Sequence, residues 1–98
     1  MRKINISTKA KKELIKLKQN KKFNIDEFNM LINMIAAGQP LPAKYYDHKL
    51  SKSSREEYLK CRDFHFRPNI CVVYRLLDDY VEIRRVGSHQ DLRLTENL

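Results

Sequence analysis

Three segments in the second half of the chain, residues 59–66, 70–77 and 80–86, are rich in aromatic and β-branched side chains. Segments of this composition favour β-strands, and the breaks between them are only a few residues long. Breaks this short allow neighbouring strands to pair as hairpins but cannot hold a crossover connection. This part of the chain is therefore predicted to form a three-stranded antiparallel meander.

The break before the third segment predicts the register of the last hairpin. Residues 78–79 are both aspartate and form a tight two-residue turn. A turn at this place sets Arg75 opposite Glu82 and Tyr74 opposite Ile83. One cross-strand pair is then charge-matched and the other is apolar, so the register is consistent with the turn.

The N-terminal part predicts a strand followed by a helix. Residues 2–7 alternate between polar and apolar, with Ile4 and Ile6 facing inward. Ser7 or Thr8 can cap the helix that follows, which runs to about residue 20. Its buried stripe has helical spacing and consists of Ala10, Leu14 and Leu17.

A second helix is predicted after Asn24, because Glu27 follows three residues later as in a capping box. Gly38 fits the left-handed position just past the end of this helix, and Pro40 and Pro42 prevent its continuation. The buried stripe of this helix is expected to be Phe28, Leu31, Ile32 and Ile35.

Residues 43–57 lack a clear period and are predicted to form a long loop, with a helical turn near residues 53–57. Residues 92–98 read as a polar tail. The expected fold is α+β: an N-terminal strand and two helices packed on one face of a small antiparallel sheet, in a single domain spanning residues 1–98. Alternation in the first strand of the meander turns Phe64 and Phe66 towards the helices and leaves Asp63 and His65 on the open face.

The net charge of +8 is concentrated at the N-terminus. Residues 1–22 hold nine basic residues and one acid, Glu13, whereas residues 23–98 hold eleven of each. Such a basic patch favours a polyanion or an acidic protein partner, although it is also typical of a solvated helix face. The candidate RNA contacts in this patch are Lys9, Lys11, Lys12 and Lys16.

The cellular setting predicted from the sequence is the cytoplasm. The longest apolar runs are too short to cross a membrane or to serve as an export signal. Cys61 and Cys71 are expected to be buried free thiols, because their number and spacing do not suggest a disulfide framework. A zinc site built from Cys61 and His65 with either Cys71 or His89 is conceivable, but the spacing matches no common pattern.

The three histidines, His48, His65 and His89, suit acid–base chemistry because their pKa lies near neutrality. A ribonuclease that works without metal needs a base for the ribose 2′-OH, an acid for the 5′-oxygen and a cation for the phosphate. Arginine suits the phosphate because its planar fork binds two oxygens at once. The candidates for that task are Arg62, Arg84 and Arg85.

Several motifs that contain these residues follow one another between residues 30 and 92. They are Leu41-Pro42-Ala43, Tyr46-Asp47-His48-Lys49-Leu50, Arg62-Asp63-Phe64-His65 followed by Pro68, and Arg85-Val86-Gly87-Ser88-His89. Each motif is unspecific alone, but the ordered set includes all three histidines. The set resembles the YafQ family of toxins in the RelE/ParE superfamily.

The resemblance implies a RelE-like microbial ribonuclease fold and an mRNA endonuclease that acts on the ribosome as the toxin of a type II toxin–antitoxin system. The expected partners are a cognate antitoxin, mRNA and the ribosome, with DNA reached through the antitoxin and with no membrane, metal or cofactor. By the same resemblance, His48, His65 and His89 share acid–base duty and phosphate contact. Arg85 stabilises the transition state, and Asp63 orients His65 or assists proton transfer.

The chain departs from the family pattern at two candidate RNA contacts. Asn69 stands where relatives usually carry Asp, so this position cannot act as a base. Arg93 stands where relatives often carry an aromatic residue, although Arg can also stack on a base. Strict alternation would send Arg84 rather than Arg85 to the open face, so we expect a bulge or a strand end there.

Two other functions are compatible with the fold. ParE-like relatives poison DNA gyrase and need no catalytic histidines, and buried or widely separated histidines would favour that reading. A non-catalytic module that binds RNA or an antitoxin is the other alternative, with Asn69 as an early loss of activity.

Overall fold

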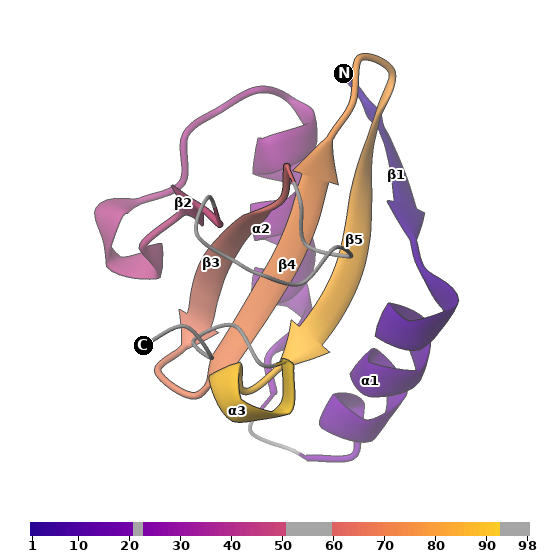
Figure 1. Cartoon of the computed structure of the whole chain (residues 1–98), viewed down its shortest axis with the longest axis vertical. Coiled ribbons are helices and arrows are strands. Elements are labelled where there is room, and N and C mark those ends of the chain that lie inside the picture. The colour runs from indigo at the N-terminus through magenta and orange to yellow at the C-terminus, as the bar shows by residue number, and fades with distance from the viewer. Residues whose placement is uncertain (21–22, 51–59, 93–98) are drawn as a thin grey trace.

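The computed structural model describes residues 1–20, 23–50 and 60–92, and its centre is one five-stranded sheet in the order β1–β5–β4–β3–β2 (Figure 1). The strands are β1 (Lys3–Ile6), β2 (His48–Lys49), β3 (Arg62–Arg67), β4 (Ile70–Leu76) and β5 (Tyr80–Gly87). The predicted antiparallel meander is confirmed as β3–β4–β5. The N-terminal strand β1 pairs with β5 in parallel, so the sheet as a whole is mixed.

The predicted register of the β4–β5 hairpin is also confirmed. Arg75 lies opposite Glu82, and Tyr74 lies opposite Ile83. The turn is closed by a hydrogen bond of 2.9 Å from the Leu77 amide to the Tyr80 carbonyl.

Both predicted helices are present, with their predicted caps. Helix α1 (Thr8–Lys18) begins after Ser7, whose hydroxyl accepts from the Ala10 amide at 3.1 Å. Helix α2 (Ile25–Ala36) begins after Asn24, whose side chain accepts from the Glu27 amide at 3.0 Å. Gly38 adopts the expected positive φ of 77° after the end of α2, where its amide and that of the next residue bond back to the last turn.

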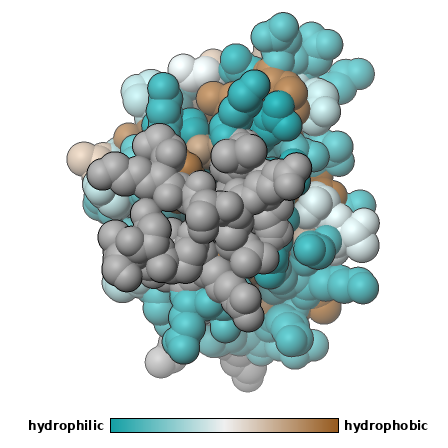
Figure 2. Space-filling view, in the orientation of Figure 1, coloured by the Kyte–Doolittle hydropathy of each residue, from teal (hydrophilic) through white to brown (hydrophobic). Residues whose placement is uncertain are grey.

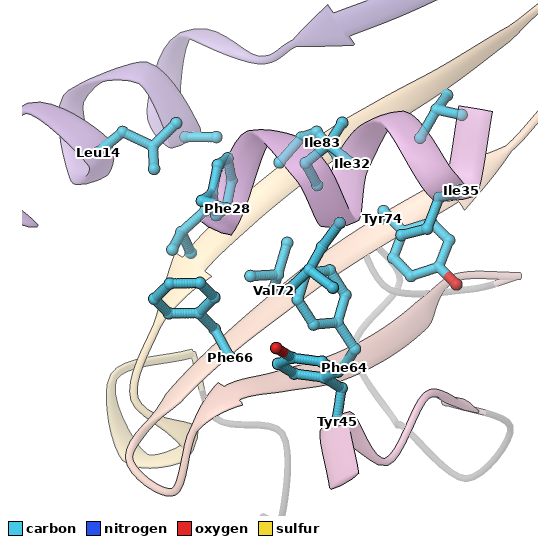
Figure 3. Close-up of a cluster of buried hydrophobic side chains, with 14 of the residues drawn as sticks. Leu14, Phe28, Ile32, Ile35, Tyr45, Phe64, Phe66, Val72, Tyr74 and Ile83 are labelled. Carbon is cyan, nitrogen blue, oxygen red and sulfur yellow. The ribbon is translucent and has the colours of Figure 1, made fainter. Parts of the chain in front are cut away.

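The main core lies between the helices and one face of the sheet (Figure 3). Helix α2 contributes the predicted stripe, and Phe64 and Phe66 of β3 point into it as expected. The close-up shows the ring of Tyr45 beside Phe64, with ring centroids 6.5 Å apart. The residues labelled there are Leu14, Phe28, Ile32, Ile35, Tyr45, Phe64, Phe66, Val72, Tyr74 and Ile83.

The opposite face of the sheet is less open than the sequence predicts. Helix α3 (His89–Leu92) follows β5, and Leu92 is 1% exposed rather than part of a polar tail. Leu92 packs with Cys61, Cys71 and Val73 in a second, smaller cluster. The prediction of two free, buried cysteines is confirmed.

Three further predictions need correction. Ile4 does not face inward but is 40% exposed, because β1 is an edge strand and its helix-side contact falls to Ile6. His48 does not lie in a loop, since it forms the short strand β2 on the edge of β3. The first meander strand begins at Arg62, whereas the turn expected near residues 53–57 lies outside the described residues.

The surface along α1 is largely hydrophilic, at the right of the space-filling view (Figure 2). This agrees with the exposure of Lys9, Lys11, Lys12 and Lys16 on that helix. Within the described part of the chain, no helix is long and apolar enough to span a membrane.

Candidate active site

One row of register partners crosses four strands and carries most of the candidate site. His48 of β2 pairs with Asp63 of β3, Asp63 with Val73 of β4, and Val73 with Arg85 of β5. Directly opposed residues share a face of the sheet. His65 lies two residues after Asp63 on the same face, as alternation predicts. The sheet therefore gathers four of the five predicted catalytic residues on one face.

The two histidines of this face converge on one buried carboxylate. The Asp63 Oδ2 atom lies 3.6 Å from His48 Nε2 and 3.7 Å from His65 Nε2. The Asp63 side chain is fully buried, whereas the His48 and His65 side chains are 30% and 25% exposed. The two imidazole rings are thus partly accessible from outside, although the Nε2 atom of His65 is itself buried.

The orientation of His48 is set by a backbone carbonyl. Its Nδ1 atom lies 2.8 Å from the Tyr46 carbonyl oxygen, which can only accept a hydrogen bond. The neutral ring therefore carries its proton on Nδ1, and Nε2, which lies 3.6 Å from Asp63 Oδ2, is left unprotonated. This tautomer presents Nε2 as a proton acceptor.

Asp63 is itself poised to exchange a proton near neutrality. Burial, together with the negative charge of Asp47, raises the pKa of the Asp63 carboxyl from 3.8 to about 7. A carboxyl with this pKa can hold or release a proton under the same conditions as an imidazole. Asp63 is thus suited to proton transfer at physiological pH.

Tyr46 is a neighbour of this cluster that the sequence reasoning did not assign to the site. Its ring centroid lies 4.5 Å from that of His48 and 5.4 Å from that of His65. The residue is 61% exposed and has a positive φ of 48°. Its place directly before Asp47 and His48 in the motif was the available signal.

Arg85 reaches the open face because of the predicted bulge, which the strand pairing confirms. Val73 pairs with Arg85 but the next residue, Tyr74, pairs with Ile83, so Arg84 is the additional residue. Arg84 Nη1 donates to Glu82 at 2.8 Å, within its own strand.

The Arg85 guanidinium is held by an acid from α1. Arg85 Nε and Nη2 both donate to Glu13 Oε2, at 3.0 and 2.8 Å. The second oxygen of Glu13 accepts the Val86 amide at 2.8 Å. Glu13 is therefore another residue of the site that was not predicted, although it is the single acid among residues 1–22.

The predicted RNA contacts are not all close to the histidines. Arg62 alternates to the helix-facing side of β3, where its Nε donates to Asp47 and to the Tyr74 hydroxyl, each at 3.2 Å. Asn69 is exposed in the turn between β3 and β4. The four lysines lie on α1, which packs mainly against β5 (Figure 1).

Two predicted site residues, His89 and Arg93, lie partly or wholly outside the described residues. The backbone of His89 begins α3, two residues after Gly87, and Gly87 pairs with Cys71, the partner of His65. The register thus leads the chain towards the His65 end of the cluster, but the His89 side chain is not among the described parts. Arg93 lies outside the described residues.

The His48, Asp63 and His65 cluster also has the chemistry of a metal site. One ligand atom from each residue lies within 4.8 Å of the others. Two imidazoles and a carboxylate suit divalent transition metals, and a backbone carbonyl already orients His48. This set differs from the cysteine-containing set considered from the sequence.

The comparisons with known proteins agree with this fold. The family described as bacterial toxin of type II toxin–antitoxin system, YafQ, matches residues 2–94. The mRNA interferase toxin YafQ of Escherichia coli strain B is 33% identical over 79 residues, which are 80% of this chain and 82% of that protein.

Two solved structures extend the agreement to three dimensions. The E. coli DinJ–YafQ complex matches with a TM-score of 0.74 and 32% identity, covering 94% of this chain and 98% of that one. A metal-bound toxin from Helicobacter pylori matches with a TM-score of 0.81 and 30% identity, covering 94% and 99%.

The fold and the matches define a toxin of a type II toxin–antitoxin system. Within that class, the chain belongs to the YafQ family, because the family match spans nearly its whole length. The resemblance drawn from the sequence motifs is thereby confirmed.

Proposed function

We propose that this toxin is an mRNA endoribonuclease that cuts on the ribosome without a metal, using histidines as acid and base. Its homologues are named mRNA interferases, which supports the substrate class. The observation that carries the mechanism is the buried Asp63 carboxylate between the partly exposed His48 and His65 imidazoles. The adjacent histidines favour this function over gyrase inhibition, which needs no such pair.

The roles follow from the tautomer and the strand row. His48 Nε2 takes the proton from the ribose 2′-OH, whose oxygen attacks the phosphorus and forms a 2′,3′-cyclic phosphate. His65 donates a proton to the 5′-oxygen as the P–O5′ bond breaks. Asp63 lies within 4 Å of both rings and balances the charge that each gains or loses.

Arg85 is proposed to stabilise the charge that develops on the phosphate, because it shares the face and the register row of Asp63. His89 is proposed as a third group beside the phosphate, from its motif and from the position of its backbone at the start of α3. Arg84, Asn69, Arg93 and the α1 lysines are proposed to contact RNA farther from the cut.

A cognate antitoxin is the proposed protein partner. The E. coli relative was solved in complex with DinJ, which supports a paired antitoxin here. Contact with DNA is proposed to occur through the antitoxin, and the ribosome as target places the protein in the cytoplasm.

The test is single-turnover cleavage of mRNA held in programmed ribosomes. His48→Ala and His65→Ala are expected to slow cleavage by about 10²–10⁴-fold. Met30→Ala, on an exposed position of α2, serves as the folded control. Products of the parent should end in 2′,3′-cyclic phosphate and 5′-OH. Histidine variants as fast as the parent would rule out this mechanism, and inhibition of gyrase without RNA cleavage would favour the ParE-like alternative.

A further inference from the structure

We propose that the exposed ring of Tyr46 is a platform on which one base of the RNA stacks beside the cleavage site. This inference rests on the proposed function, since it assigns a base contact to the same site. It makes Tyr46 a residue that determines how the substrate is seated rather than one that moves a proton.

The position of the ring carries the inference. Tyr46 lies 4.5 Å from His48 between ring centroids, with an angle of 30° between the two planes. It meets His65 nearly edge-on, with an angle of 79°. The tyrosine ring is therefore next to both imidazoles, within one ring width of the groups proposed to act on the ribose and the phosphate.

The exposure of this ring separates it from an ordinary packing residue. Tyr45, its neighbour in the chain, is 5% exposed, contacts Phe64 and donates its hydroxyl to Glu27 at 2.7 Å. Tyr46 is 61% exposed. One tyrosine thus belongs to the core, whereas the other is displayed on the surface beside the cluster.

The backbone holds Tyr46 in place at a conformational cost. A positive φ is uncommon for a residue with a bulky side chain. The Tyr46 amide donates to the Ala43 carbonyl at 3.0 Å, and the Tyr46 carbonyl orients His48. Strain of this kind in a residue other than glycine is concentrated at functional sites.

An exposed aromatic ring beside a nuclease site has a natural ligand in a nucleobase. Stacking accepts every base, because each has a π-face, and one stacked base strengthens binding by roughly 5- to 150-fold. Single-stranded RNA in particular is recognised through unstacked bases seated on aromatic side chains. Because His48 lies against one face of the Tyr46 ring, a base would stack on the opposite face and bring its nucleotide to the edge of the cluster.

The experiment measures binding of an uncleavable mRNA in programmed ribosomes, with a 2′-deoxy nucleotide at the cut position. The proteins compared are the parent, Tyr46→Phe, Tyr46→Ala and, as a matched loss of an aromatic ring, Tyr80→Ala on β5. We expect Tyr46→Phe and Tyr80→Ala to bind within about twofold of the parent. Tyr46→Ala should bind about tenfold more weakly, because stacking needs the ring and not the hydroxyl.

A second set of mRNAs carries an abasic site at each position flanking the cut in turn. At one position the missing base should weaken mRNA binding by the parent as much as Tyr46→Ala does. The same abasic mRNA should bind to the Tyr46→Ala protein no more weakly than the intact mRNA does. If the loss of binding from the abasic site and the loss from Tyr46→Ala multiply at every position, the proposal is overturned. A Tyr46→Ala protein that binds normally but cuts slowly would also overturn it, since Tyr46 would then only position His48.

The same proteins distinguish failure of the inference from failure of the proposed function. If the parent cuts ordinary mRNA and the Tyr46 effects multiply with the abasic effects, the stacking inference alone is wrong. If the parent binds with the expected pattern but histidine variants cut normally, the acid–base mechanism is wrong and the stacking contact stands. A parent that does not bind the mRNA overturns both.

Discussion

Glu13 on α1 and Arg85 on β5 are 72 positions apart in the sequence, yet one carboxylate oxygen of Glu13 accepts from both Nε and Nη2 of Arg85. The other oxygen accepts the Val86 amide. Strand β1 ends at Ile6, opposite Ile83, and beyond this point β5 is bonded first by Ser7, at the Arg84 carbonyl, and then by Glu13. The basic helix is thus tied to the strand that presents the proposed phosphate-binding arginine.

Replacing Glu13 with Gln should slow RNA cleavage by about tenfold, because Arg85 loses the charged partner that fixes its orientation. The measurement is the single-turnover rate constant. Asp26→Asn is the control, because it removes one exposed negative charge without touching Arg85. In an Arg85→Ala background the Glu13 change should have little further effect. A faster Glu13→Gln enzyme would mean that Glu13 restrains Arg85 instead.

Asp63→Asn should make the protein more stable at pH 8 while abolishing most of its activity. The pKa of Asp63 is about 7 in the folded protein, above its ordinary 3.8, so the folded state holds this proton more tightly than the unfolded chain. The contribution of the Asp63 carboxyl to the free energy of unfolding is therefore complete below about pH 4. It falls by at most about 4 kcal/mol as the pH rises towards 7.

Urea denaturation at pH 4 and pH 8 measures this effect. Parent and Asp63→Asn should differ little at the lower pH and most at the higher pH, whereas Asp26→Asn should follow the parent. If Asp63→Asn is less stable than the parent at pH 8, the folded protein stabilises the ionised Asp63 carboxylate.

Leu92→Ala should destabilise the protein by about 2–5 kcal/mol, the range for truncating a buried leucine. Leu92 is 1% exposed, and it packs against Gly87, where an added Cβ would lie 3.3 Å from Leu92 Cδ2. Loss of this anchor should also loosen α3, which begins at His89, and so reduce cleavage. Leu92→Met, with a similar volume, should cost less than about 1.5 kcal/mol. If the parent and Leu92→Ala unfold at the same urea concentration, the burial of Leu92 is contradicted.

Zn²⁺ should inhibit cleavage, and EDTA should leave the metal-free enzyme active. His48, Asp63 and His65 offer ligand atoms within 4.8 Å of one another, and a bound ion would occupy the groups proposed to move protons. Calorimetry should give one zinc site in the parent and weaker binding in His65→Ala. An enzyme that EDTA inactivates and Zn²⁺ restores would show instead that the reaction depends on a metal.

Local patterns in the sequence were sufficient for most of the fold. Period-two alternation assigned Phe64 to the core and Asp63 to the opposite face, and both assignments hold because alternation is a property of any strand. Ser7 and Asn24 were recognisable caps because capping bonds span three residues. The conflict between alternation and the Arg85 motif was enough to predict a bulge or a strand end there, and the structure has a bulge at Arg84.

The candidate site was predicted in part. His48, Asp63, His65 and Arg85 were named from ordered motifs, and strand pairing brings them to one face. Arg62 was placed with them, but it alternates to the helix side and contacts Asp47. Tyr46 and Glu13 were missed, because neither exposure of a ring nor an ion pair across 72 residues has a local pattern.

The sequence by itself thus determined strands β1, β3, β4 and β5, the two long helices with their caps, and the face of most strand residues, since these depend on neighbours within a few positions. Only the tertiary structure decided the burial of Asp63, the exposure of Ile4 and Tyr46, and the capture of Arg85 by Glu13. These properties depend on which strand becomes an edge and which distant segments meet, and that is settled when the whole chain packs.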